Sequence, residues 1–191
     1  MNSLIIDIGT SSMRGILFSE TGERLAFHQV IYAPVKYEDG RIEQSPEDWT
    51  GSLEKIVSAV AKKAKEQAQE IDALAVTAQR SAIIPVDREG QPLMDTIMWQ
   101  DRRNAGICKE LEQYNDLIFE RSGAKINTVF SGSRMGWICK NRPDVCEKLY
   151  KFVNIPEYVM HHMTGEYKTD ATYGSRSHLM NLRTRRWDPE M

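Results

Sequence analysis

The sequence has few cysteines, no long apolar run and no excess of positive charge, and each absence excludes a class of protein. The 191 residues include three cysteines, with no CxxC pair and no secretory leader. We therefore expect reduced thiols in a cytoplasmic protein rather than a disulfide framework. The apolar runs are too short to span a bilayer, and MNSLIID predicts a strand rather than a signal peptide. A formal net charge of −2 disfavours a nucleic-acid surface, so we expect neither membrane nor nucleic acid as a partner.

The chain also lacks internal repeats, low-complexity linkers and metal-ligand spacings. His161 and His162 are adjacent, so on a helix they would point about 100° apart and could not chelate one metal. What remains is the composition of a globular protein, 41% hydrophobic and 27% charged. A chain of this length buries roughly 70% of its unfolded surface, which suits one domain or a large lobe of a longer protein.

The order of strand and helix patterns predicts an α/β fold with a mixed sheet. Three strands separated by turn sequences are predicted over residues 4–7, 12–19 and 24–32. They should form an antiparallel meander. A helix is predicted over 46–69, with Ser45 as N-cap and Pro46 as its first residue. The short apolar run 71–78 predicts a buried strand parallel to the first.

Shorter elements follow in the second half of the chain. The segment 81–99 predicts two strands joined by a turn at Gly90, and a helical pattern begins at Asp101. Further elements are predicted as short helices over 115–123 and 132–141, a strand over 151–155 and a helix over 156–165. Asp188 is placed to cap a helix that the sequence announces at its end. A frayed tail explains this ending, but a chain cut from a longer protein is favoured.

The stretch LIIDIGTSSMRGILF carries more polar chemistry than a turn requires. Asp7 ends the first strand, and Gly9 permits φ > 0 and close approach of a ligand to the backbone. Hydroxyl groups beside backbone N–H groups suit a phosphate oxygen, and they come from Thr10, Ser11 and Ser12. Arg14 adds positive charge, and a carboxylate beside phosphates is useful where Mg²⁺ lies between them. A plain hairpin with a polar turn explains the same residues, and no Walker A sequence is present.

A second group of polar and aromatic residues follows the next apolar runs. They are Gln79, Arg80 and Ser81 after one strand, and Trp99, Gln100, Asp101 and Arg102 after another. Tryptophan can stack on the C–H face of a sugar, while amide, carboxylate and guanidinium groups bind its hydroxyls in fixed geometry. A buried tryptophan followed by a charged helix start is an equally good interpretation.

Three motifs together resemble the FGGY family of carbohydrate kinases, which includes glycerol kinase and xylulokinase. They are DIGTSSMRGILF, TAQRSAIIPVDREGQPL with IMWQDRR, and MTGEYKTDATYGSRSHLMNLRTRRW, and the resemblance covers essentially the whole chain. It implies the ribonuclease-H-like fold of actin, hexokinase and the Hsp70 ATPase. It also implies phosphorylation of a sugar or polyol hydroxyl, with ATP as co-substrate and Mg²⁺ as cofactor. The chain would be a sugar-binding N-terminal lobe, incomplete at its C-terminus and without the ATP-binding second lobe.

The resemblance assigns roles to both polar groups. Asp7 resembles the family's Mg-associated aspartate. The first phosphate loop would consist of Gly9, Thr10, Ser11 and Arg14, with Ser12 beside them. The sugar pocket would be lined by Arg80, Trp99 and Asp101, with their neighbours Gln79 and Ser81. The general-base aspartate is expected in a later segment, so we expect no catalytic residue and no turnover from these residues alone.

Two departures from glycerol kinase leave the substrate open. Ser81 stands where that enzyme has a glutamate, and Val129 stands where it has a tyrosine. Arg80-Ser81 also differs from the Gln-Met-His-Gly of xylulokinase. A non-catalytic member of the same fold that senses a sugar or nucleotide is the alternative function, and the sequence leaves a homo-oligomer open.

Overall fold

The N-terminal half of the chain forms a four-stranded sheet with one long helix on it. The computed structural model describes all residues, 1–191. The strands are β1 (Ser3–Ile8), β2 (Ser12–Phe18), β3 (Arg24–Ile31) and β6 (Ala73–Ala78), in the order β3-β2-β1-β6. Neighbours among β1, β2 and β3 are antiparallel, whereas β6 is parallel to β1. The predicted meander and its parallel fourth strand are confirmed.

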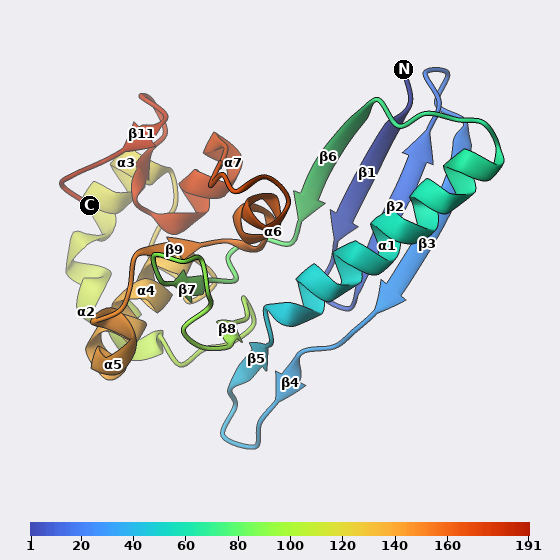
Figure 1. Ribbon diagram of the computed structural model, residues 1–191. Coiled ribbons are helices and arrows are strands. Elements are labelled where there is room, and N and C mark those ends of the chain that lie inside the picture. The colour runs from blue at the N-terminus through green and yellow to red at the C-terminus, as the bar shows by residue number, and fades with distance from the viewer.

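Helix α1 (Glu47–Glu66) lies diagonally across one face of this sheet (Figure 1). Alternation in β1 turns Leu4, Ile6 and Ile8 toward the core, and each is at most 1% exposed. The helix contributes Trp49, Leu53, Ile56 and Val60 to the same core. It begins at Glu47 rather than at Pro46, which occupies the cap position. It ends at Glu66 rather than at 69, because Ala68 has a left-handed φ of 53°.

The expectation that the strand at 71–78 is buried is wrong. Leu74 of β6 is 40% exposed, and Ala75 and Thr77 are also exposed. β6 is the edge strand of the sheet and pairs only with β1. Its apolar sequence predicted cover on both sides, but within this chain the cover is partial, with α6 (Ile155–Thr164) packed against the strand and the Tyr173 hydroxyl bound to Ala78 at its end.

The remaining elements form a second, mainly helical part beside β6 (Figure 1). Its short strands are β4 (Val35–Lys36), β5 (Ile42–Gln44), β7 (Ile84–Val86), β8 (Thr96–Ile97), β9 (Lys151–Val153), β10 (Met180–Asn181) and β11 (Arg186–Trp187). Its other helices are α2 (Ala105–Leu111), α3 (Asn115–Ser122), α4 (Ser131–Asn141), α5 (Pro143–Cys146) and α7 (Ala171–Gly174). β7 pairs with β9, and β5 pairs with β4 and β8. No helix is long and apolar enough to cross a membrane.

One predicted local signal, the end of a helix at Gly165, is confirmed in this part, and two others are not. Gly165 ends α6 in the left-handed region with φ 74°, and Asn154 and Glu157 form a capping box at its start. The helix expected from Asp101 begins only at Ala105. No helix forms at the chain end, although the Asp188 carboxylate accepts the Glu190 N–H at 3.1 Å as a cap would.

The contact between β2 and α1 supplies a test of the packing. A Cβ on Gly15 would overlap the Ile56 side chain of α1. We expect Gly15→Ala to lower the free energy of unfolding by about 1–3 kcal/mol, because an overpacked core must shift. Gly51, in α1, has no atom within 4 Å of the position its Cβ would take. The matched control Gly51→Ala should therefore raise that free energy by about 0.5–1 kcal/mol. Urea denaturation measures both, and a Gly15→Ala variant as stable as the parent would contradict this contact.

Candidate functional site

The candidate site lies where β1 and β6 end side by side. Their carboxyl ends point toward the helical part (Figure 1), and Ile8 is in register with Ala78. The Gln79 N–H extends the pairing by donating to the Ile8 carbonyl at 2.8 Å. Two loops that are far apart in the sequence, 9–11 and 79–81, therefore begin at neighbouring points.

The loop after β1 is fixed from both sides and presents free N–H groups. The Gly9 carbonyl accepts the Tyr32 hydroxyl at 2.9 Å and the Gln79 amide at 3.4 Å. The Gly9 N–H donates to the Ser12 carbonyl at 2.9 Å. The N–H groups of Thr10 and Ser11 donate to no acceptor within the chain. Adjacent unpaired N–H groups on a fixed loop are the arrangement that binds an anion.

Of the two roles predicted for Gly9, a positive φ is wrong, and the close approach of a ligand stays a prediction. Gly9 does not have a positive φ, unlike Gly22, Gly40 and other turn glycines. The structure shows a different reason for a glycine, because a Cβ on Gly9 would lie 3.2 Å from the Ser12 carbonyl oxygen of the same loop.

Asp7 and Arg14 are cross-strand neighbours at the mouth of the loop. Arg14 Nη1 lies 3.4 Å from Asp7 Oδ2, and their side chains are 48% and 40% exposed. An ion pair this exposed contributes little to stability, so both groups can exchange partners when a ligand arrives. Among the three hydroxyl residues, Ser11 is exposed, Thr10 is half-buried and Ser12 is 5% exposed, so Ser12 is the least accessible.

A groove of about 420 Å³ joins the two loops. It is lined by Thr10, Ala78, Gln79, Arg80, Ser81, Trp99, Val129 and Arg176. Trp99 is 38% exposed, so its ring is accessible. Thr10 connects loop and groove, since its Oγ1 donates to Gln79 Oε1 at 2.9 Å and accepts from Trp99 Nε1 at 3.4 Å. The structure thus brings Gln79, Arg80, Ser81 and Trp99 to the loop that follows Asp7.

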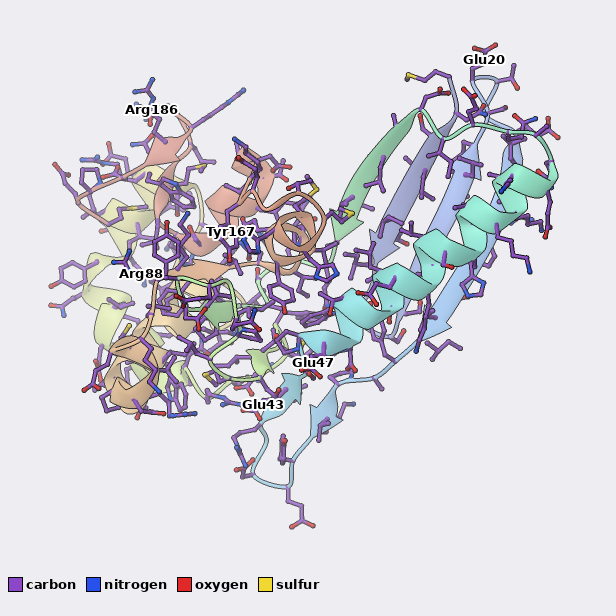
Figure 2. The ribbon with its side chains drawn as sticks, in the orientation of Figure 1. Glu20, Glu43, Glu47, Arg88, Tyr167 and Arg186 are labelled. Carbon is purple, nitrogen blue, oxygen red and sulfur yellow. The ribbon has the colours of Figure 1, made fainter.

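The structure does not bring Asp101 to this groove. Its carboxylate is fully buried and accepts the Ile42 N–H at 2.7 Å and Arg103 Nη2 at 2.6 Å. Arg103 also reaches Glu43 of β5 at 2.8 Å, and Figure 2 labels Glu43 beside the helical part. Burial raises the pKa of Asp101, but the hydrogen bonds from Arg103 and Ile42 outweigh it and hold the pKa below its ordinary value. A direct role for Asp101 in substrate binding stays a prediction.

One residue without a predicted role, Arg134 of α4, holds the groove together. Its guanidinium is fully buried and donates to backbone carbonyls from separate segments. The acceptors are Ser81 at 3.0 Å, Val129 at 2.8 Å, Trp99 at 2.6 Å and Asp101 at 3.3 Å. Burial lowers the pKa of Arg134 to about 10, so it remains a cation at neutral pH. In the sequence, the buried position of Arg134 is indicated only by its small and apolar neighbours in the predicted helix.

Aromatic and basic side chains surround Phe130, the residue after Val129, and no role was predicted for them either. The Arg176 guanidinium carbon lies 4.4 Å from the centre of the Phe130 ring. Phe130 in turn contacts the His178 ring at a centroid distance of 4.2 Å. His178 is 4% exposed, and burial lowers its pKa to about 4, so it is neutral at pH 7.

Comparisons with known proteins agree with this architecture. The model of the FGGY family of carbohydrate kinases, N-terminal domain, matches residues 2–191. A glycerol kinase from Thermococcus gammatolerans is 32% identical over 98% of this chain and 39% of its own length. The crystal structure of Plasmodium falciparum glycerol kinase with ADP is 26% identical, with a TM-score of 0.93 over 98% of this chain and 40% of that one. Xylulose kinase from Rhodospirillum rubrum is 19% identical, with a TM-score of 0.95 over 100% of this chain and 39% of that one.

The chain belongs to the FGGY family of carbohydrate kinases, and its fold is the ribonuclease-H-like fold of these sugar kinases. It spans about two fifths of the length of the curated relatives it matches. The predicted family and fold are confirmed.

Arg134 supplies the first test of the site. Arg134→Met would leave four carbonyls without their donor, so we expect the free energy of unfolding to fall by about 3 kcal/mol. Arg142→Met is the matched control, because Arg142 pairs only with exposed Asp144 and should cost at most about 1 kcal/mol. Guanidinium chloride denaturation compares the two. Equal losses would show that Arg134 is not the brace described.

Asp101 supplies a pH-dependent test. Since its folded pKa lies below the ordinary 3.8, the stability it provides is present above that pH and disappears as the pH falls further. We expect Asp101→Asn to lower the free energy of unfolding by roughly 3 kcal/mol at pH 7. The difference between parent and variant should shrink below about pH 4. Urea denaturation between pH 7 and 3 measures this, and a difference independent of pH would contradict the buried ion pair.

Proposed function

We propose that the complete protein transfers the γ-phosphoryl group of ATP to a hydroxyl of a sugar or polyol. Residues 1–191 would provide the sugar groove and the first phosphate loop. One observation carries the proposal, namely that Thr10 belongs to both, because it offers an unpaired N–H to the loop and hydrogen-bonds to Gln79 and Trp99 of the groove. Phosphoryl transfer depends chiefly on such positioning of the two reactants. The ADP in the P. falciparum glycerol kinase supports a nucleotide co-substrate.

The groove end of the site suits a polyhydroxylated carbon chain. The exposed Trp99 ring offers an apolar face for C–H groups, and exposed Arg80 offers several donors to hydroxyl oxygens. Ser81 is held in the left-handed region with φ 70°, and its carbonyl is fixed by Arg134. Strain of this kind persists where the surrounding structure imposes it, which favours a functional groove.

The loop end of the site suits phosphate. The free N–H groups of Thr10 and Ser11 can donate to phosphate oxygens, and Arg14 is close enough to add charge. Asp7 would hold Mg²⁺, directly or through water, and the ion would neutralise phosphate charge. No three His, Cys, Asp or Glu side chains converge anywhere in the chain. One accessible carboxylate is nonetheless the kind of site Mg²⁺ uses when phosphates and waters complete its ligands.

Asp7 is the most direct test of this function. In the complete protein, we expect Asp7→Ala to lower kcat at least about 100-fold, because charge stabilisation at the phosphates is lost. The melting temperature should change little, since the pair with Arg14 is exposed. A coupled ADP-release assay and thermal unfolding measure the two effects. Asp39→Ala removes a comparably exposed aspartate far from the loop and serves as control. Full turnover in Asp7→Ala would remove Asp7 from the mechanism.

The second test concerns substrate length. Ser81 and Val129 stand where glycerol kinase has a glutamate and a tyrosine. The carboxylate and the phenol that could bind glycerol hydroxyls are therefore missing, so glycerol should be a poor substrate. We expect its kcat/KM to be at least about 10-fold below that of the best four- to six-carbon compound. Val129→Tyr should narrow this gap. A substrate panel with ATP measures the ratio, and glycerol as the best substrate would contradict the assignment.

A further inference from the structure

Tyr32 binds the loop after β1 at two points. It follows β3 directly, and its N–H donates to the Ser11 carbonyl at 3.1 Å, which continues the pairing of β3 with β2 beyond Ile31. Its side-chain hydroxyl donates to the Gly9 carbonyl at 2.9 Å. The Tyr32 side chain is half-buried and packs against the hydrophobic core between the sheet and α1. The core therefore holds the hydroxyl in place, and the hydroxyl holds the loop.

The hydroxyl contact sets the direction of the peptide group between Gly9 and Thr10. The chain has no cis peptide bond, so the carbonyl and the N–H of this planar group point in opposite directions. Because the Gly9 carbonyl points toward the Tyr32 hydroxyl, the Thr10 N–H is turned away from it. The Thr10 N–H has no acceptor within this chain, and it is one of the two N–H groups that the proposed function assigns to phosphate.

The Tyr32 hydroxyl is the shorter of the two contacts that keep this orientation. The other donor to the Gly9 carbonyl is Gln79 Nε2, at 3.4 Å. A peptide group beside a glycine rotates at little steric cost, because glycine has no Cβ. A rotated group would present its carbonyl oxygen to phosphate in place of the N–H, and two oxygens with negative charge repel each other.

The Tyr32 hydroxyl keeps its proton under physiological conditions. Burial raises the pKa of Tyr32, and the carboxylates of Asp7 and Asp48 raise it further. A carbonyl oxygen has no proton to give, so the contact with Gly9 requires the protonated hydroxyl as donor.

We propose that Tyr32 is a positioning residue for phosphoryl transfer, whose hydroxyl fixes the Gly9–Thr10 peptide group so that the Thr10 N–H faces the phosphate. Tyr32 lies 23 residues from Gly9 in the sequence and acts through the backbone, without contact to either substrate. Donors that are oriented before the reaction stabilise developing charge without the cost of reorientation. This inference rests on the proposed function and adds to it a residue outside the loop.

Tyr32→Phe in the complete protein removes only the hydroxyl and tests this role. We expect kcat/KM for ATP to fall about 10-fold, which is the contribution of one hydrogen bond. The KM for the carbon substrate should not change, because Tyr32 does not line the groove. Coupled ADP-release assays at varied ATP and at varied carbon substrate measure the two constants.

Tyr167→Phe is the matched control, because the Tyr167 hydroxyl is buried without a hydrogen-bond partner in this chain and lies in the helical part (Figure 2). It should leave both constants unchanged. An unchanged kcat/KM for ATP in Tyr32→Phe would overturn the inference and leave the kinase function intact. Equal losses for ATP and for the carbon substrate, together with a lower melting temperature, would show that Tyr32 only stabilises the fold, and would overturn it too.

Nucleotide binding separates the inference from the proposed function. Calorimetry without a carbon substrate compares the non-hydrolysable ATP analogue AMP-PNP, bound to Mg²⁺, with AMP, which lacks the β- and γ-phosphates. We expect Tyr32→Phe to weaken binding of AMP-PNP about 10-fold and to leave binding of AMP unchanged. If no compound is phosphorylated, the kinase function fails, and this selective loss still supports the role of Tyr32.

Three results of the calorimetry would overturn the inference. They are equal binding of AMP-PNP by the parent and Tyr32→Phe, an equal loss for AMP and AMP-PNP, and a parent that does not bind AMP-PNP. The last result would also contradict the proposed function.

Discussion

The buried Arg134 guanidinium is the interaction on which the site depends. It binds carbonyls that follow β6, β8 and α3, and these carbonyls belong to Ser81, Trp99, Asp101 and Val129. Side chains that line the groove project from the same short segments. A buried cation without these four acceptors would be costly, and the four carbonyls without the cation would be unsatisfied. The groove and its brace are therefore stable only together.

The position of the site follows from strand direction. Because β1 and β6 are parallel, their polar ends meet at one edge, and the Gln79 N–H continues the ladder onto Ile8. Thr10 then joins the loop 9–11 to the groove through hydrogen bonds with Gln79 and Trp99. These two hydrogen bonds would give the proposed transfer its geometry, since a hydroxyl bound in the groove would face phosphate bound at the loop.

Elements defined by local pattern could be predicted from the sequence, and interactions between distant segments could not. The apolar period of α1 and the Gly165 end of α6 are properties of neighbouring residues, and both are confirmed, although α1 is shorter at each end than predicted. The Asp101 carboxylate is hydrogen-bonded to the N–H of Ile42, which lies 59 residues earlier. No local sequence pattern indicates a contact over this distance. For the same reason no role was predicted for Arg134 and Arg176. The apolar sequence of β6 predicted a buried strand, but β6 lies at the edge of the sheet and is partly exposed.

The central claim is that this lobe positions a carbon hydroxyl for phosphoryl transfer. The most direct measurement is ³¹P NMR of the products formed by the complete protein from ATP and candidate sugars, polyols and sugar acids. The account predicts a phosphate monoester on carbon, formed together with an equal amount of ADP. ADP accompanied only by inorganic phosphate across the whole panel, or no reaction at all, would contradict it.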